Sequence, residues 1–293
     1  MVDFISGAHV SSSGGIFNAI GNGEKIEAEA IQIFASPPQT WRQTNHKPEA
    51  IEKFRTLHAD SDVGDVWIHN IYLANLAAED PEQLKKSIDS VQFALRIADA
   101  IGAEGVVLHT GSHKGRGMDA VADQVTDALI EILKDAPGTA LLALEDMAGQ
   151  GGQIGKEFGE LGMLLKRVQS DRLQICLDTC HAFAAGYDLG SSDGLEASMT
   201  EFDQEIGLEH LAVIHANDSK VERGGLRDRH ENIGEGHIGM PGFEAITTHP
   251  AFEGKAFLLE VPGFENEDGK TEGPDLENIN RLKRLRAGTA AVV

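Results

Sequence analysis

Eight short apolar runs constrain the fold of this chain more than any other feature of its sequence. They are Asp3–Ala8, Ile31–Phe34, Val66–Ile68, Gly105–Leu108, Ala140–Leu144, Leu173–Leu177, Leu211–Ile214 and Ala256–Leu259. Each run is too short for a helix, and none alternates polar and apolar residues as a half-exposed strand does. All eight are therefore expected to be strands that are buried on both faces of a sheet.

Amphipathic patterns between these runs predict helices. In one pattern, Ile88, Val91 and Leu95 recur at steps of three and four residues, and Pro81 and Gly102 lie near its ends. Eight strands that alternate with helices predict a closed (β/α)8 TIM barrel, an α/β fold with parallel strands and an active site at their carboxyl ends. We expect a single domain at residues 1–285 and a frayed tail at 286–293.

The composition excludes several classes of protein. No stretch approaches the roughly 20 continuous apolar residues of a membrane helix, and the first residues carry Asp3 and no basic segment, so we expect a cytoplasmic monomer without a membrane partner. Cys176 and Cys180 are the only cysteines, which excludes a disulfide scaffold and predicts two buried thiols. Taken alone, the net charge of −22 argues against a nucleic-acid partner.

Residues that can bind metal follow six successive apolar runs. They are His69, His109, Glu145, Asp178, His215 and Glu260, and His181 comes three residues after Asp178. Since the carboxyl ends of barrel strands meet at one face, these side chains are expected to converge. Crowded carboxylates repel one another unless a cation lies between them. The pattern therefore favours bound metal, and imidazole and carboxylate ligands suit zinc or a similar ion.

A long segment at residues 215–255, rich in Gly, His and charge, is expected to be a functional loop. Within it, Asp228 and His230 are two residues apart, so both side chains can point to one side of an extended chain. They raise the number of candidate ligands to nine, which suits two or three ions if a carboxylate bridges. Three divalent ions would outweigh the four carboxylates, so the site could attract a phosphate to an acidic protein.

Three sequence motifs carry a resemblance to a known family. Leu177–Asp188, His215–Lys220 and Asp228–Gly236 resemble the signatures of the endonuclease IV family, the apurinic/apyrimidinic (AP) endonuclease family 2 of DNA repair enzymes. The resemblance extends from Gly7 to Pro262. It implies a TIM barrel that uses zinc to hydrolyse the phosphodiester 5′ to an abasic site in double-stranded DNA during base-excision repair. The products would carry a 3′-hydroxyl and a 5′-deoxyribose phosphate.

The resemblance also implies how the nine ligands are shared among three zinc ions. The expected sets are His69, His109 and Glu145 for the first ion; Glu145, Asp178, His215 and Glu260 for the second; and His181, Asp228 and His230 for the third. Glu145 bridges the first two ions in this arrangement. Glu145 and Glu260 are the expected catalytic residues.

Other positions match the family's DNA contacts or depart from them. Tyr72 and Leu73 match a recognition loop that enters the minor groove at the lesion, and Lys220 and Arg229 match positions near the DNA path. Gln39 stands where the family usually places an intercalating Arg. The loss of that cation predicts weaker binding of the lesion.

A second departure and two alternative functions bear on the interpretation. Asp146 and Met147 follow Glu145 where the family usually has Asn and Thr, so the surroundings of that ligand are expected to differ.

A metal-dependent sugar isomerase or epimerase on a related barrel also gathers such ligands but normally holds one or two metals. Asp228 and His230 favour the endonuclease. A non-catalytic relative would have no reason to keep all nine ligands.

Overall fold

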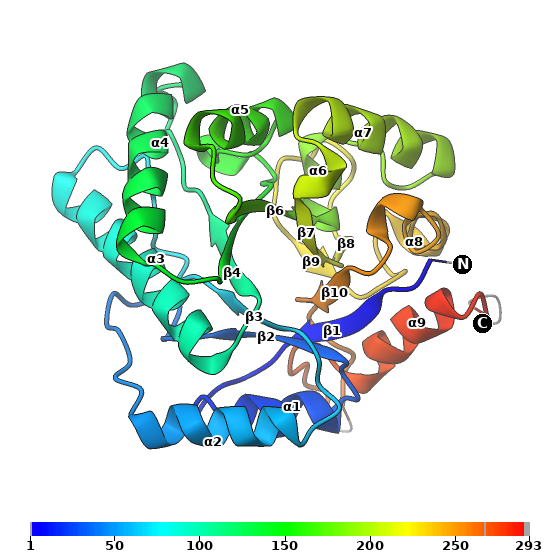
Figure 1. Cartoon of the computed structure of the whole chain (residues 1–293). Helices are drawn as coiled ribbons and strands as arrows, with labels where there is room; N and C mark the ends of the chain where they lie inside the picture. Colours follow the sequence, from blue (N-terminus) through cyan, green and yellow to red (C-terminus); the bar gives the residue numbers. More distant parts are fainter. Residues whose placement is uncertain (1, 267, 290–293) are drawn as a thin grey trace.

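The computed structural model describes residues 2–266 and 268–289, so residues 290–293 of the expected tail lie outside the described residues. Eight parallel strands close into a barrel, each paired with its neighbours in the chain (Figure 1). The strands are β1 (Ile5–His9), β2 (Ala30–Phe34), β3 (Val66–His69), β4 (Gly105–His109), β5 (Leu141–Glu145), β6 (Leu173–Asp178), β7 (Leu211–His215) and β10 (Ala256–Leu259). Pairing of β1 with β10 completes the ring. The predicted TIM barrel is confirmed.

The strands differ from the apolar runs mainly at their carboxyl ends. Six of them run one residue further than predicted and end on His9, His69, His109, Glu145, Asp178 and His215. Backbone pairing continues through these polar residues, for example between His109 and Glu145 and between Asp178 and His215. The reason is that a ladder is made by backbone N–H and C=O groups, which a polar side chain does not remove. At the other end, β1 begins at Ile5 rather than at Asp3.

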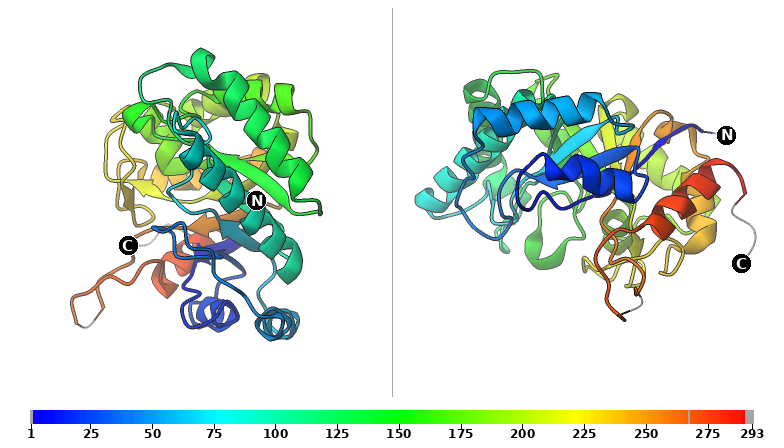
Figure 2. Two further views of the ribbon diagram at one scale, coloured as in Figure 1. Left: turned by 90° about the vertical axis from the view of Figure 1, so that its left-hand side faces the viewer. Right: turned by 90° about the horizontal axis from the view of Figure 1, so that it is seen from below.

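Helices follow every barrel strand and surround the barrel (Figures 1 and 2). They are α1 (Asn18–Lys25), α2 (Pro48–Ala59), α3 (Pro81–Ile101), α4 (Met118–Asp135), α5 (Phe158–Val168), α6 (Thr179–Ala185), α7 (Ser192–Glu205), α8 (Gly239–Ile246) and α9 (Leu276–Arg286), with short 3-10 turns η1 (Gln150–Gly152), η2 (Leu208–His210) and η3 (Pro250–Phe252). As predicted, α3 begins at Pro81 and stops before Gly102, which is left-handed at φ 75°. In the described part of the chain, no helix has the length and apolar character that a membrane crossing requires.

The long segment between β7 and β10 has structure of its own. A short antiparallel ribbon joins β8 (Asp218–Ser219) to β9 (His230–Glu231), and α8 follows it. The buried carboxylate of Asp218 accepts hydrogen bonds from five backbone N–H groups, those of Ser219, Gly234, Gly236, Ile238 and Gly239. A carboxylate held in this way fixes the path of the segment that carries Asp228 and His230.

Two apolar layers are separated by the barrel wall. The larger one lies between the strands and the helices. The smaller one fills the barrel and consists of Ala30, Trp67, Val107, Ala143, Cys176, Val213, Ala256 and Leu258. Space inside is tight, since a Cβ placed on Gly7 would lie 2.8 Å from the Cβ of Ala30.

Both cysteines are free and fully buried, as predicted, and burial raises the pKa of each thiol to about 12.

Candidate metal centre

Every barrel strand places one polar side chain above the apolar layer that fills the barrel. These side chains come two residues after an inward-pointing position, and alternate residues of a strand face the same side. They are His9, Gln32, His69, His109, Glu145, Asp178, His215 and Glu260. Six of the eight were predicted as ligands. His9 and Gln32 were missed, although strand pairing sets them side by side.

The predicted ligands converge at the mouth of the barrel. His69, His109 and Glu145 form one group, and Glu145, Asp178, His215 and Glu260 form another; within each group the ligand atoms lie within 4.8 Å of one another. These groups coincide with the first two expected sets. Glu145 belongs to both, so its carboxylate is placed to bridge.

The third expected set comes together around Asp228. One of its carboxylate oxygens lies 3.2 Å from Nε2 of His181, and the other lies 3.0 Å from Nε2 of His230. Asp178 also approaches His230 Nε2, at 3.5 Å. The ribbon therefore brings a pair of ligands from the long segment to a ligand on α6, and all nine predicted ligands lie in one cluster.

Hydrogen bonds orient three of the imidazoles. Each donates Nδ1–H to a backbone carbonyl: His69 to Asn70 at 2.6 Å, His181 to Asp146 at 2.9 Å and His230 to Glu260 at 3.3 Å. Their Nε2 atoms are buried without a hydrogen-bond partner, and so is Oε2 of Glu145. Buried polar atoms without partners are costly. Here they face one another with their lone pairs free, which is the arrangement that a metal ion requires.

The charges of the cluster show the same demand for cations. Burial opposes ionisation of Glu145, but the imidazoles of His215 and His109 outweigh it and hold the pKa of that carboxyl well below its usual range. Burial likewise opposes protonation of His230, yet the Asp178 and Asp228 carboxylates raise its pKa to about 9. The carboxylates of the cluster therefore favour positive charge among the imidazoles, and bound metal ions would supply that charge.

Asp146, which directly follows the candidate ligand Glu145, forms hydrogen bonds with two further candidate ligands. Oδ1 of Asp146 accepts the backbone N–H of Asp178 at 2.6 Å, and its carbonyl orients His181. Burial, together with the nearby Asp178 carboxylate, raises the pKa of Asp146 well above its usual range. Met147, the next residue, is also buried. The side chain that departs from the family pattern at Asp146 therefore touches one candidate ligand, Asp178, directly.

The predicted DNA-contacting residues stand around the rim. Tyr72 is 49 % exposed, and its ring centre lies 5.2 Å from that of His69. Its backbone N–H bonds to Pro38, which brings the exposed Gln39 beside it, and Leu73 is half-buried next to it. Two exposed cations, Lys220 and Arg229, lie next to the ribbon, where the backbone N–H of Lys220 donates to the Arg229 carbonyl. The five residues come from the loops that follow β2, β3 and β7.

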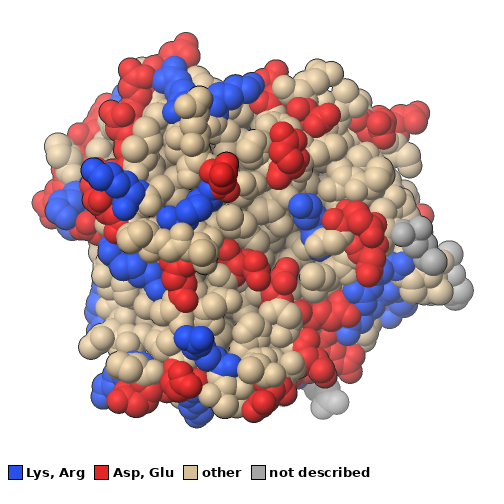
Figure 3. All heavy atoms as spheres, viewed as in Figure 1, with Lys and Arg blue, Asp and Glu red and all other residues tan. Residues whose placement is uncertain are grey.

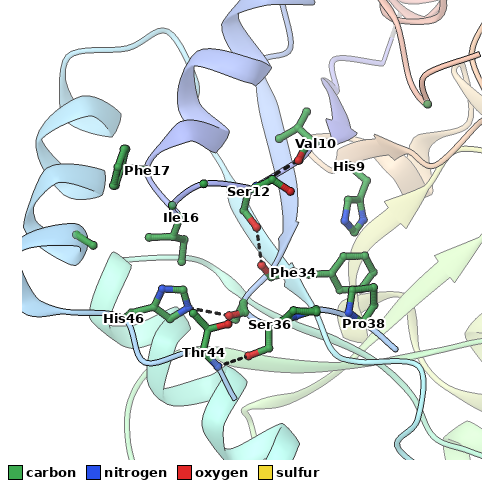
Figure 4. A pocket seen from close by; sticks show the side chains of 18 of the residues that line it. His9, Val10, Ser12, Ile16, Phe17, Phe34, Ser36, Pro38, Thr44 and His46 are labelled. Atoms are coloured by element: carbon green, nitrogen blue, oxygen red, sulfur yellow. Dashed lines mark hydrogen bonds between the residues drawn. The ribbon is translucent and has the colours of Figure 1, made fainter. Parts of the chain in front are cut away.

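A cavity of about 1250 Å³ opens beside the cluster. The loops that follow β1, β2 and β10 line it, and it reaches Asp228, His230 and Glu260. Figure 4 shows His9 beside Phe34, whose ring centres are 4.4 Å apart, and the hydrogen bond from Ser12 to the Phe34 carbonyl. A substrate much larger than a single sugar could therefore lie along the rim with one group at the cluster.

Acidic side chains are spread over the molecular face of Figure 3, with Lys and Arg between them in small groups. The net charge is −22. A polyanionic substrate is repelled by this surface as a whole, so its attraction has to come from the mouth of the barrel. Ions bound by the cluster would supply that attraction.

Comparison with known proteins places the chain in a family. Residues 22–285 match a family model described as "Xylose isomerase-like TIM barrel". "Probable endonuclease 4" of Haloarcula marismortui is 39 % identical over 280 residues, covering 96 % of this chain and 98 % of that protein. The crystal structure of endonuclease IV from Thermus thermophilus superposes with a TM-score of 0.82 at 33 % identity, covering 97 % of this chain and 98 % of that one.

More distant structures share the fold alone. A D-tagatose 3-epimerase-like protein superposes with a TM-score of 0.70 at 20 % identity, over 99 % of this chain and 97 % of that one. Identity over the full length and the closed barrel thus agree with the motifs at 177–188, 215–220 and 228–236. The chain belongs to the endonuclease IV family.

Proposed function

We propose that this protein is a zinc-dependent endonuclease of base-excision DNA repair. It hydrolyses the phosphodiester 5′ to an apurinic/apyrimidinic site in double-stranded DNA and leaves a 3′-hydroxyl and a 5′-deoxyribose phosphate. One observation carries the proposal: in a chain of this family, unpartnered imidazole and carboxylate atoms face one another at the mouth of the barrel. Since one chain supplies all nine ligands, we expect a monomer to be active.

The donor set suits zinc. Imidazole nitrogen and carboxylate oxygen are both common zinc ligands, and no cysteine thiolate is needed. Glu145 would serve two of the ion sets, because its Oε2 lies 3.4 Å from His69 Nε2 and its Oε1 lies 3.0 Å from His215 Nδ1. His181, Asp228 and His230 would hold the third ion.

Zinc ions bound there would offset charge on the phosphate and lower the pKa of a neighbouring water. The protein's own part is to hold the ligands rigidly. Glu145 and Glu260 act as the catalytic carboxylates, because each presents one oxygen toward His215 at the centre of the cluster. Their fixed positions mean that little reorganisation is needed when charge builds up during hydrolysis.

The rim would hold the damaged duplex. In this proposal Tyr72 and Leu73 contact the minor groove at the lesion, where an aromatic ring can replace the stacking of a missing base. Lys220 and Arg229 would contact phosphates, which position the duplex without reading its sequence. Gln39 supplies a neutral amide at the same rim.

A metal-dependent sugar isomerase or epimerase is the second candidate, because proteins of that kind share the fold. The ribbon argues against it. Asp228 and His230 form a further pair of candidate ligands, and Nε2 of His230 has no hydrogen-bond partner. An isomerase that holds one or two metals has no use for this additional pair.

The decisive experiment uses a duplex with a single tetrahydrofuran abasic analogue. We expect the zinc-loaded protein to make one incision, 5′ to the analogue, and a chelator to stop it until zinc is added back. An undamaged duplex of the same sequence is the control and should stay intact. Zinc-loaded protein that leaves the analogue uncut, or that epimerises a ketose instead, would rule the proposal out.

A further inference from the structure

Gln32 is a fully buried amide on β2, a strand that supplies none of the predicted ligands. Both ends of its side chain contact candidate ligands. Nε2 donates to Oε1 of Glu260 at 2.7 Å, and Oε1 accepts from Nε2 of His215 at 2.9 Å. The amide thus joins β2 to β7 and β10 across the mouth of the barrel.

The direction of these two hydrogen bonds determines which nitrogen of His215 is free. A carbonyl oxygen can only accept, so His215 must carry its hydrogen on Nε2. Its Nδ1 faces the cluster, at a hydrogen-bond distance of 3.0 Å from Oε1 of Glu145 and at 3.5 Å from Oε2 of Glu260. A metal ion would take the place of the hydrogen that Nδ1 shares with Glu145. His69, His181 and His230 have the opposite tautomer, with hydrogen on Nδ1. His215 is therefore the imidazole that needs a side-chain acceptor.

The opposite orientation of the amide is excluded by its neighbours. It would set the Gln32 carbonyl against the Glu260 carboxylate, which are both acceptors. In that orientation the Gln32 NH2 group would donate to Nε2 of His215. The imidazole hydrogen would then sit on Nδ1, and Nδ1 could not bind a metal ion. The Glu260 carboxylate thus fixes the orientation of the Gln32 amide, and the amide fixes a hydrogen on Nε2 of His215.

His9 completes the arrangement around Glu260. Its Nδ1 lies 3.1 Å from the same Oε1 that Gln32 binds. The same Nδ1 also lies 3.1 Å from Nε2 of Gln32, so His9, Gln32 and Oε1 of Glu260 form one hydrogen-bonded group. Oε2 of Glu260 faces His215 instead. A carboxylate oriented in this way presents one oxygen to an ion and keeps the other in hydrogen bonds.

We propose that Gln32, assisted by His9, is a positioning residue of the second metal set: it holds His215 in the tautomer that presents Nδ1 and turns Glu260 so that Oε2 faces the ion. The proposal rests on the metal site of the proposed function, but it concerns ion retention rather than the choice of substrate. Gln32 does not touch the ion itself.

The test compares Gln32→Met and Gln32→Ala with the wild type, all loaded with zinc. Methionine keeps the length of the side chain without its hydrogen bonds, and alanine removes it without crowding. Gln92→Met is the matched control, because Gln92 is a buried amide on α3 that accepts from Arg96 and lies outside the cluster. Zinc affinity is measured by competition with a chromophoric chelator, and circular dichroism checks the fold.

We expect one zinc ion to be bound about 10- to 100-fold more weakly in both Gln32 variants, as loss of a residue that orients a ligand usually gives. The other ions should be retained, and Gln92→Met should bind like the wild type. Cobalt-loaded Gln32→Met should show an altered visible spectrum. With abasic DNA, kcat should fall while KM changes little, and excess zinc should restore part of the rate.

Wild-type affinity for every ion in either folded Gln32 variant would overturn the proposal. The two hypotheses fail separately. If the wild type does not cut abasic DNA but binds zinc more tightly than both Gln32 variants, the proposed endonuclease activity is wrong and the role of Gln32 stands. If the wild type cuts and the Gln32 variants bind and cut equally well, the endonuclease stands and the role of Gln32 is wrong.

Discussion

At the residue scale, Glu145 is the side chain on which the cluster converges. It is fully buried at the end of β5, with Oε2 3.0 Å from His109 Nε2 and Oε1 3.0 Å from His215 Nδ1. Sequence reasoning found it because an acid directly after an apolar run is conspicuous. It missed Gln32 because that residue lies inside an apolar run, where only the pairing of β2 with β1 shows that it stands level with His9.

Removal of the Glu145 carboxylate should disable the site and leave the barrel folded. In Glu145→Ala we expect cleavage of abasic DNA to fall at least several hundredfold, because the first two ligand sets lose their shared oxygen atoms. Glu157→Ala, which removes an exposed carboxylate outside the cluster, is the control and should cleave normally. Normal cleavage by Glu145→Ala, measured on the same duplex, would show that this carboxylate is not needed.

Gln39 offers a test of the rim. In Gln39→Arg we expect abasic DNA to bind several-fold more tightly at moderate salt, with a steeper salt dependence of about 0.9 in log–log slope for one new phosphate contact. Fluorescence anisotropy at a series of salt concentrations gives both quantities. An unchanged affinity would mean that the loop after β2 does not touch DNA.

At the element scale, strand positions were predictable and the ribbon was not. Barrel strands are buried on both faces, so their apolar runs stand out, and the structure places them within two residues of the prediction. The ribbon of β8 and β9 is held instead by the Asp218 carboxylate and backbone N–H groups from residues 219–239, a contact that leaves no apolar pattern. Spacing alone suggested that Asp228 and His230 act together, and the ribbon explains how they reach His181.

The last helix is joined to the barrel by an ion pair. Arg286, at the end of α9, donates two hydrogen bonds of 2.7 Å to Glu29, and Ser6 donates to the same carboxylate. Arg286 also bonds to the Phe4 carbonyl. The first residue of the expected tail is thus tied to β1 and to the start of β2.

This ion pair should make stability depend on pH. Partial burial opposes ionisation of Glu29, but hydrogen bonds from Arg286 and Ser6 outweigh it and lower its pKa from 4.5 to about 2. A lowered pKa in the folded state stabilises the protein above the unfolded value, and this contribution disappears as the pH falls from about 4.5 to about 2. We expect Glu29→Gln to lower the free energy of unfolding by about 1 kcal/mol at pH 7.

Urea unfolding of wild type and Glu29→Gln at several pH values measures the difference. It should shrink toward zero on acidification through that range. A difference that stays constant from neutral pH to pH 3 would show that the pair contributes nothing through ionisation.

At the scale of the whole molecule, the acidic surface and the proposed substrate have the same sign of charge. A net charge of −22 repels a duplex at long range. The account therefore depends on ions among the nine ligands to reverse the local charge. Sequence reasoning could state this need from residue counts, but only the closed barrel shows that residues 69 to 260 meet in one place.

The most direct test of this central claim is the zinc content of the purified protein. Elemental analysis after dialysis against metal-free buffer should give about three zinc ions per chain, and the number should fall in His230→Ala, which removes one ligand of the third set. One ion or none per wild-type chain would contradict the account, because the nine ligands would then crowd together without the cations that their geometry requires.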